Sequence, residues 1–118
     1  MIALNLSPFE YITEEDKQLP IEQQTTFILR VLSAKEFAEE QSMIKLTEGT
    51  MDTSTLGSQT LLVLGYGLVG WKNLLDGQGG TIEFDKDKKI DLIDASTRYE
   101  LFGQIMEHST IGKSASKN

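Results

Sequence analysis

The segment LLVLGYGLVGW contains a glycine pattern, G-x-G-x-x-G, formed by Gly65, Gly67 and Gly70. In dinucleotide-binding proteins this pattern joins a strand to a helix whose N-terminus binds pyrophosphate, and an acidic residue about 20 positions later binds the ribose. Asp85 has this spacing. However, only residues 71–75 separate the motif from the next glycine-rich turn, and about 7.5 Å of helix is too short to cross a sheet. The spacing therefore argues against a nucleotide-binding loop.

The apolar residues around these glycines recur instead at the spacing of an α-helix. Steps of three and four separate Leu61, Leu64, Leu68, Trp71 and Leu75. Such a stripe predicts a helix over about 59–75 that buries this side, with Trp71 in the core. Gly67 and Gly70 lie on a neighbouring face, where small residues permit the close approach of another element. That element is either another helix of this chain or a partner subunit.

The other residues with catalytic or metal-binding side chains form no recognised site. His108 is the single histidine, which excludes metal sites built from several histidines, and its place near the end of a predicted helix favours a structural role. Aspartates and lysines alternate over 85–94 without the glycine of a calcium loop, so we expect a solvated turn. Residues 14–16 are likewise expected in a polar loop. We predict no catalytic residue, no metal site, no cofactor and no enzymatic activity.

Composition limits the class of protein. The chain has 118 residues, of which 39% are hydrophobic and 25% are charged, so we expect a single globular domain over 1–118. The sequence has no membrane span and no signal-peptide pattern, which favours the cytoplasm and predicts no membrane contact. It has no cysteine, and its formal net charge is −7. This acidity disfavours direct nucleic-acid binding, which needs a basic surface, and is compatible with a basic partner.

Residues 25–32 (TTFILRVL) have the best strand pattern of the chain. Both faces are mostly apolar, so the strand is expected at the centre of a sheet. Ser33 and Glu36 then match a capping box, which predicts a helix over about 34–46. Its apolar stripe is predicted to contain Ala34, Phe37, Ala38, Gln41 and Ile44, and its solvated side Glu36, Glu39 and Glu40.

The remaining elements are shorter. Strands are predicted over 2–6, 9–12 and 81–84. A loop is predicted over 47–58, a last helix over about 96–108, and a flexible tail over 109–118. Asp94 or Ser96 caps the last helix. The predicted fold class is therefore α+β, with a small, mainly antiparallel sheet packed against about three helices.

Three stretches together resemble small proteins encoded in the structural modules of tailed bacteriophages and prophages. QTTFILRVLSAKEFAEEQ is similar to a T-x-F-x-L-R-x-L-S-x-x-E opening, and LGYGLVGWKNLLDGQGGTIEFD to a G-L-x-G-W-x-N-F helix end with a D-x-x-G hairpin. RYELFGQIMEHSTI and the terminal Lys-Asn are similar to the closing E-L-x-x-x-I-x-x-S helix. The resemblance covers about 25–118. Leu74, where an aromatic is usual, and Phe102-Gly103, where small helix formers are common, depart from it.

The resemblance implies a non-enzymatic protein of virion morphogenesis. One form is a tail assembly chaperone, which holds the tape-measure or tube protein in the host cytoplasm. Another is a minor structural component of the head, neck or tail, which contacts a capsid or tail protein in the virion. A third interpretation is an acidic inhibitor of a host defence or nucleic-acid enzyme. A homo-oligomer is compatible with these forms. The candidate partner-binding residues are Gly67, Gly70, Trp71, Asn73, Asp76 and Phe84.

Overall fold

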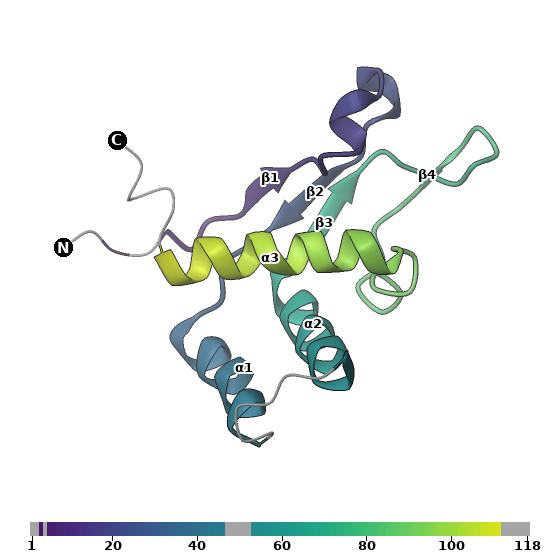
Figure 1. The fold of residues 1–118 in the computed structure, drawn as a ribbon. Coiled ribbons are helices and arrows are strands. Elements are labelled where there is room, and N and C mark those ends of the chain that lie inside the picture. Colours follow the sequence, from purple (N-terminus) through teal and green to yellow (C-terminus); the bar gives the residue numbers. More distant parts are fainter. Residues whose placement is uncertain (1–2, 4, 47–52, 112–118) are drawn as a thin grey trace.

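The computed structural model describes residues 3, 5–46 and 53–111 of the chain. They form three α-helices and two small antiparallel sheets (Figure 1), which confirms the predicted α+β class. The helices are α1 (Ala34–Leu46), α2 (Thr53–Gly67) and α3 (Ala95–Ile111). The strands are β1 (Phe9–Tyr11), β2 (Thr26–Leu29), β3 (Leu68–Lys72), β4 (Leu74–Leu75) and β5 (Thr81–Ile82).

β2 is the central strand of the three-stranded sheet, and β1 and β3 both run antiparallel to it. This confirms the central position that its two apolar faces predicted. Phe27 of β2 lies opposite Trp71 of β3, and both side chains belong to the core. The predicted strand over residues 2–6 is wrong for those of its residues that the structure describes. Residues 3, 5 and 6 are exposed and form no strand, because they have no buried face to pair; residues 2 and 4 lie outside the described residues.

The capping box at the start of α1 is present as predicted. The backbone N–H of Ser33 donates to Glu36 Oε1 at 2.9 Å, and the N–H of Glu36 donates to Ser33 Oγ at 3.3 Å. Arg30, just after β2, adds a two-pronged ion pair to the same carboxylate, at 2.9 and 2.8 Å. The pair lowers the pKa of Glu36 from 4.5 to about 2, and the Ser33 hydrogen bond acts in the same direction. These contacts join the end of β2 to α1.

The buried face of α1 differs from the predicted one. Glu40, expected in solvent, is 3% exposed, whereas Ala34, Ala38 and Gln41 of the predicted stripe are exposed; the side chain of Ile44 lies outside the described residues. Glu40 Oε2 accepts a hydrogen bond from Gln59 Nε2 of α2 at 2.5 Å. A buried carboxylate needs such a donor, and it comes from a residue that helical periodicity within α1 does not reveal.

The predicted helix 59–75 is wrong at both ends. α2 begins at Thr53, inside the predicted loop 47–58, and ends at Gly67, where the chain continues directly as β3; residues 47–52 lie outside the described residues. Leu68 and Trp71 are buried as strand residues, not as helix residues. The register of β2 against β3 shifts between Ile28 and Leu29, which marks a bulge. The buried residues Leu68 and Trp71 therefore lie three positions apart in β3, the same step that separates residues on one face of a helix.

Two glycines of the motif, Gly67 and Gly70, adjoin other elements of this same chain. A Cβ atom at Gly67 would lie 2.6 Å from Ile105 Cδ1 of α3, and one at Gly70 would lie 3.2 Å from Ile28 Cδ1 of β2. The carbonyl of Gly67 also accepts a hydrogen bond from the N–H of Arg30 at 2.9 Å. The close neighbour of Gly67 is therefore α3, one of the two possibilities that the sequence left open.

Lys89 supports the same junction from the turn before α3. The expectation that this whole turn is solvated is wrong here, because Lys89 is 7% exposed. Its Nζ donates to the carbonyls of Gly65 and Leu68 at 3.0 and 2.5 Å. The first of these carbonyls lies in the last turn of α2, where acceptors lack helical partners, and the second belongs to the first residue of β3. Burial, and secondarily the charge of Arg30, lower the pKa of Lys89.

In the view of Figure 1, α3 crosses in front of the three-stranded sheet, and α1 and α2 lie below α3. Asp94 caps α3 by accepting the N–H of Thr97 at 2.8 Å, one of the two predicted caps. Leu101 and Ile105 are fully buried. α3 runs past the predicted end at 108 to Ile111, and the rest of the predicted tail lies outside the described residues. Among the described residues, no helix combines the length and apolarity that a membrane span requires.

We expect Gly67→Ala to lower the free energy of unfolding by about 1–3 kcal/mol, because the new methyl group overpacks Ile105. Gly65→Ala is the matched control, since a Cβ there meets nothing within 4 Å and alanine is favoured over glycine by up to about 1 kcal/mol in a helix. Urea unfolding measures both. Equal stability of the two variants would contradict the close approach of α3.

We expect Glu36→Gln to lower the free energy of unfolding by about 1–3 kcal/mol at pH 7. Because the folded state lowers the pKa of Glu36 from 4.5 to about 2, this stabilisation is present above pH 4.5 and disappears as the pH falls through about 2. The difference between wild type and variant therefore shrinks over that window in pH-dependent urea melts. Glu83→Gln, at an exposed carboxylate, should show little effect. A pH-independent difference would refute the ion pair.

Candidate partner-binding surface

Three of the predicted partner-binding residues pack inside the molecule. Gly67 and Gly70 have the internal neighbours described above. Trp71 is 7% exposed and belongs to the core, as its apolar stripe predicted. Its Nε1 donates to the carbonyl of Ile82 at 2.8 Å, and its ring lies edge-on to that of Phe84, with centroids 4.9 Å apart. These contacts account for the residue types without a partner.

Asn73 and Asp76 lie on either side of β4 and make hydrogen bonds within the molecule. Asn73 has a positive φ of 64°, and its Nδ2 donates to the carbonyls of Glu22 and Gln24 at 2.9 and 3.0 Å. Asp76 Oδ1 accepts the N–H groups of Gln78 and Gly80, which lower the pKa of Asp76. The structure thus brings Trp71 and Phe84 together, and it places Asn73 between β3 and β4 and Asp76 directly after β4. That these residues bind a partner remains a prediction.

His108 packs within the molecule, between α3 and β1. Its ring stacks on that of Phe9 in β1, with centroids 4.0 Å apart and an angle of 17° between planes. Its Nδ1 lies 2.9 Å from the carbonyl of Gln104. This contact fixes the C-terminal half of α3 against β1 and matches the structural position predicted for the histidine.

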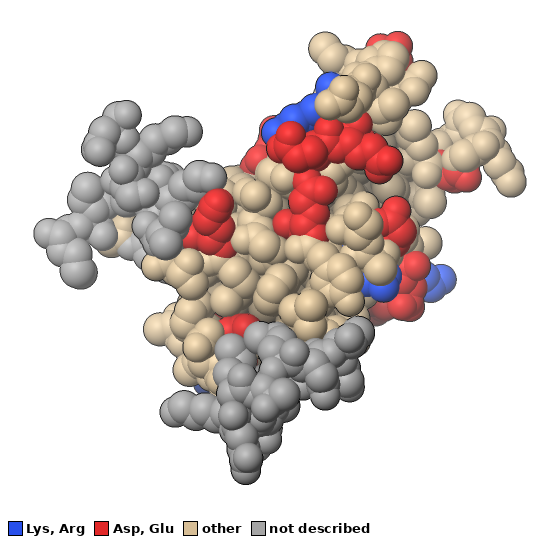
Figure 2. Space-filling view, viewed as in Figure 1, with Lys and Arg blue, Asp and Glu red and all other residues tan. Residues whose placement is uncertain are grey.

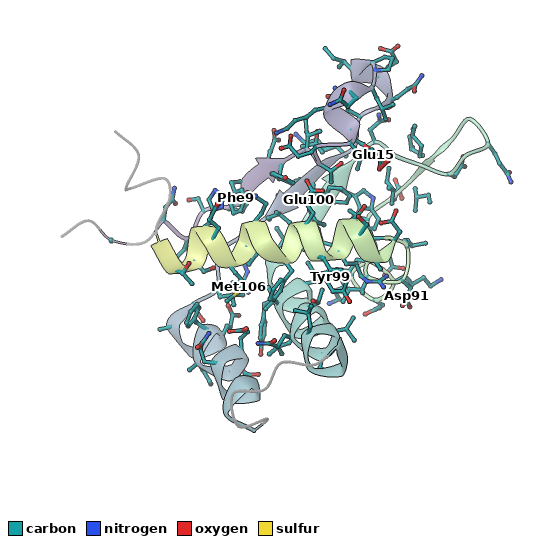
Figure 3. The ribbon with its side chains drawn as sticks, in the orientation of Figure 1. Phe9, Glu15, Asp91, Tyr99, Glu100 and Met106 are labelled. Carbon is teal, nitrogen blue, oxygen red and sulfur yellow. The ribbon has the colours of Figure 1, made fainter. Side chains whose placement is uncertain are left out.

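Acidic side chains gather on the side of the molecule where α3 and the segment after β1 lie together. Figure 2 shows this concentration of acidic residues, with few basic residues among them, and Figure 3 shows Glu15 and Glu100 on that side. We define the acidic face as Glu14, Glu15, Asp16, Asp94 and Glu100. The sequence predicted an acidic loop at 14–16 but not its meeting with α3.

Neutral donors hold three carboxylates of the acidic face in place. Glu100 Oε2 accepts the hydroxyl of Tyr11 at 2.6 Å and the N–H of Glu14 at 2.9 Å. Asp16 Oδ2 accepts the N–H of Thr25 at 2.9 Å, and Asp94 accepts the N–H of Thr97, which lowers the pKa of Asp94. These bonds orient the carboxylates without neutralising their charge. The acidic face is thus a preorganised negative surface.

Few cations oppose this charge. Lys17 pairs with Glu14 at 2.9 Å, but both side chains are largely exposed and such a pair contributes little. Arg98 lies near Asp94 and directs its guanidinium to the carbonyls of Ile90 and Ile93. Within the described part of the chain, no group of three or more histidine, cysteine, aspartate or glutamate residues is arranged to hold a metal ion. The described cations therefore leave most of the negative charge of the acidic face unopposed.

Burial and the neighbouring carboxylates of the acidic face both raise the pKa of Tyr11. Burial raises the pKa of Tyr11 above its usual value of 10, and the hydrogen bond and negative charge of Glu100 raise it further. Glu14 and Glu107 contribute in the same direction. The phenol therefore stays protonated and keeps donating to Glu100, which ties β1 to α3.

We expect Glu100→Gln to lower the pKa of Tyr11 toward 10, because the variant removes the carboxylate that disfavours the phenolate. Carbon-13 NMR of the tyrosine Cζ atoms during a pH titration measures this change. Tyr66, whose hydroxyl donates to Glu39, serves as an internal control and should titrate as before. An unchanged pKa of Tyr11 would show that Glu100 does not act on it.

Comparison of the chain with protein-family models, with curated proteins and with solved structures finds no match.

Proposed function

We propose that this protein is a non-enzymatic component of phage virion morphogenesis, similar to a tail assembly chaperone. It binds another phage structural protein, such as the tape-measure or tube protein, during assembly in the host cytoplasm. The observation that carries the proposal is the acidic face, whose carboxylates are fixed by neutral donors and so keep their negative charge available. The resemblance over about 25–118 supplies the class of partner.

The acidic face supports binding for a physical reason. Electrostatic complementarity accelerates encounter and selects partners of opposite charge, while adding modestly to affinity. A protein that holds a partner transiently benefits from this combination, because rapid association can coexist with release. Carboxylates already oriented by Tyr11, Thr25 and Thr97 lose little conformational freedom when the partner binds.

Two alternative functions would use the acidic face in a different way. A minor component of the virion would keep the contact in the finished particle, and an acidic inhibitor would present the acidic face to a nucleic-acid-binding enzyme of the host. The location of the protein after assembly, and the identity of the protein that it retains, distinguish these functions from a chaperone.

We expect tagged wild-type protein to recover a phage structural protein from producing cells, as identified by mass spectrometry, and to be absent from purified virions. Recovery should fall as NaCl is raised, because salt screens the acidic face. Glu15→Lys should reduce recovery about two- to fivefold or more, whereas Glu83→Lys, an exposed site outside the acidic face, should not.

Stoichiometric presence in virions would reject the chaperone in favour of the structural component. Recovery of a host enzyme, with no phage structural protein, would support the inhibitor. If the wild type retains neither, the proposed binding function is wrong.

A further inference from the structure

A cavity of about 170 Å³ opens within the acidic face. It lies between the segment after β1, the start of β2 and the turn that leads into α3. Its lining consists of Thr13, Glu15, Asp16, Thr25, Phe27, Leu74, Leu92, Ile93, Asp94 and Thr97. Small-molecule sites measure about 300–1,000 Å³, so this cavity has room for one side chain, not for a nucleotide or cofactor.

The lining contains three carboxylates and no lysine or arginine. Asp16 and Asp94 accept hydrogen bonds from the backbone N–H groups of Thr25 and Thr97. Glu15 is exposed, and its carboxylate has no hydrogen bond or ion pair with another described residue. Negative groups that line one cavity repel each other, and a cation between them would remove this cost.

The arrangement favours an organic cation over a metal ion. In the described part of the chain, no three acidic or histidine side chains converge closely enough to ligate a metal, so the carboxylates surround a volume, not a point. Thr13, Phe27 and Ile93 are each at most 5% exposed and form the floor. At the rim, Leu92 is 41% exposed and offers an apolar surface to alkyl carbons.

We propose that this cavity receives a lysine or arginine side chain from a basic segment of the partner protein. The alkyl stem lies against Leu92 and Leu74, and the charged head reaches Asp16 and the hydroxyl of Thr13. The identification of the partner as a phage structural protein rests on the proposed function, but the chemistry of the cavity does not. A basic side chain combines the required charge, size and amphipathic shape.

NMR titration of the full chain with Nα-acetyl-arginine amide and Nα-acetyl-lysine amide tests the cavity directly. We expect shifts of the backbone amides of Thr13, Thr25 and Thr97, with a dissociation constant on the order of 1 mM, as befits one side chain. Nα-acetyl-citrulline amide has nearly the shape of the arginine compound without its charge, and should bind at least fivefold more weakly.

Glu15→Gln tests the charge of the rim without removing a hydrogen bond within the described structure. We expect it to weaken binding of the arginine compound about two- to fivefold. Glu83→Gln, which makes the same change at an exposed position outside the cavity, should bind like the wild type. Equal binding of the citrulline compound, or no effect of Glu15→Gln, would overturn the proposal.

The two proposals fail in different ways. If the arginine compound binds the cavity but tagged wild-type protein recovers no phage structural protein, the cavity stands and the proposed function is wrong. If the protein recovers its partner but the arginine and lysine compounds shift none of these amides, the proposed function stands and the cavity proposal is wrong.

Discussion

The packing of α3 against the junction between α2 and β3 determines how the elements of the fold are placed. Helix changes to strand at Gly67 without an intervening loop, and α3 approaches so closely that a Cβ at Gly67 would lie 2.6 Å from Ile105 Cδ1. The N–H of Arg30 and the ammonium of Lys89 donate to carbonyls at this junction. A small residue and two donors from distant segments therefore fix α2, β2, β3 and α3 relative to one another.

The same junction determines where the acidic face forms. Ile105 and Leu101 hold one side of α3 in the core, which leaves Glu100 to meet β1 and the segment after it. Tyr11 and the backbone N–H of Glu14 both donate to Glu100. The packing of α3 thus converts acidic residues from separate parts of the chain into one oriented surface. We infer that this surface, with its cavity, binds the partner.

Local signals in the sequence predicted the local structure well. Ser33 and Glu36 marked the start of α1, because a capping box involves only neighbouring residues. The two apolar faces of β2 predicted its central place. The sequence misled at Leu68 and Trp71, where the spacing of buried residues next to a bulge resembles that of a helix. A period read over a few residues cannot distinguish these cases.

Contacts between distant residues were not predictable from one sequence. The burial of Glu40 depends on Gln59, and that of Lys89 on carbonyls of Gly65 and Leu68. The acidic face joins Glu15 and Asp16 to Asp94 and Glu100, which no periodicity connects. The net charge of −7 signalled an acidic surface but not its location.

Hydrogen exchange, measured on the protein alone and on its complex with the partner that we propose for it, locates the binding surface. We expect binding to slow exchange in residues 13–16 and in the segment from Asp91 through the first half of α3, and to leave exchange in α1 and α2 little changed. Protection confined to α1 and α2, with the acidic face exchanging as in the free protein, would contradict this expectation.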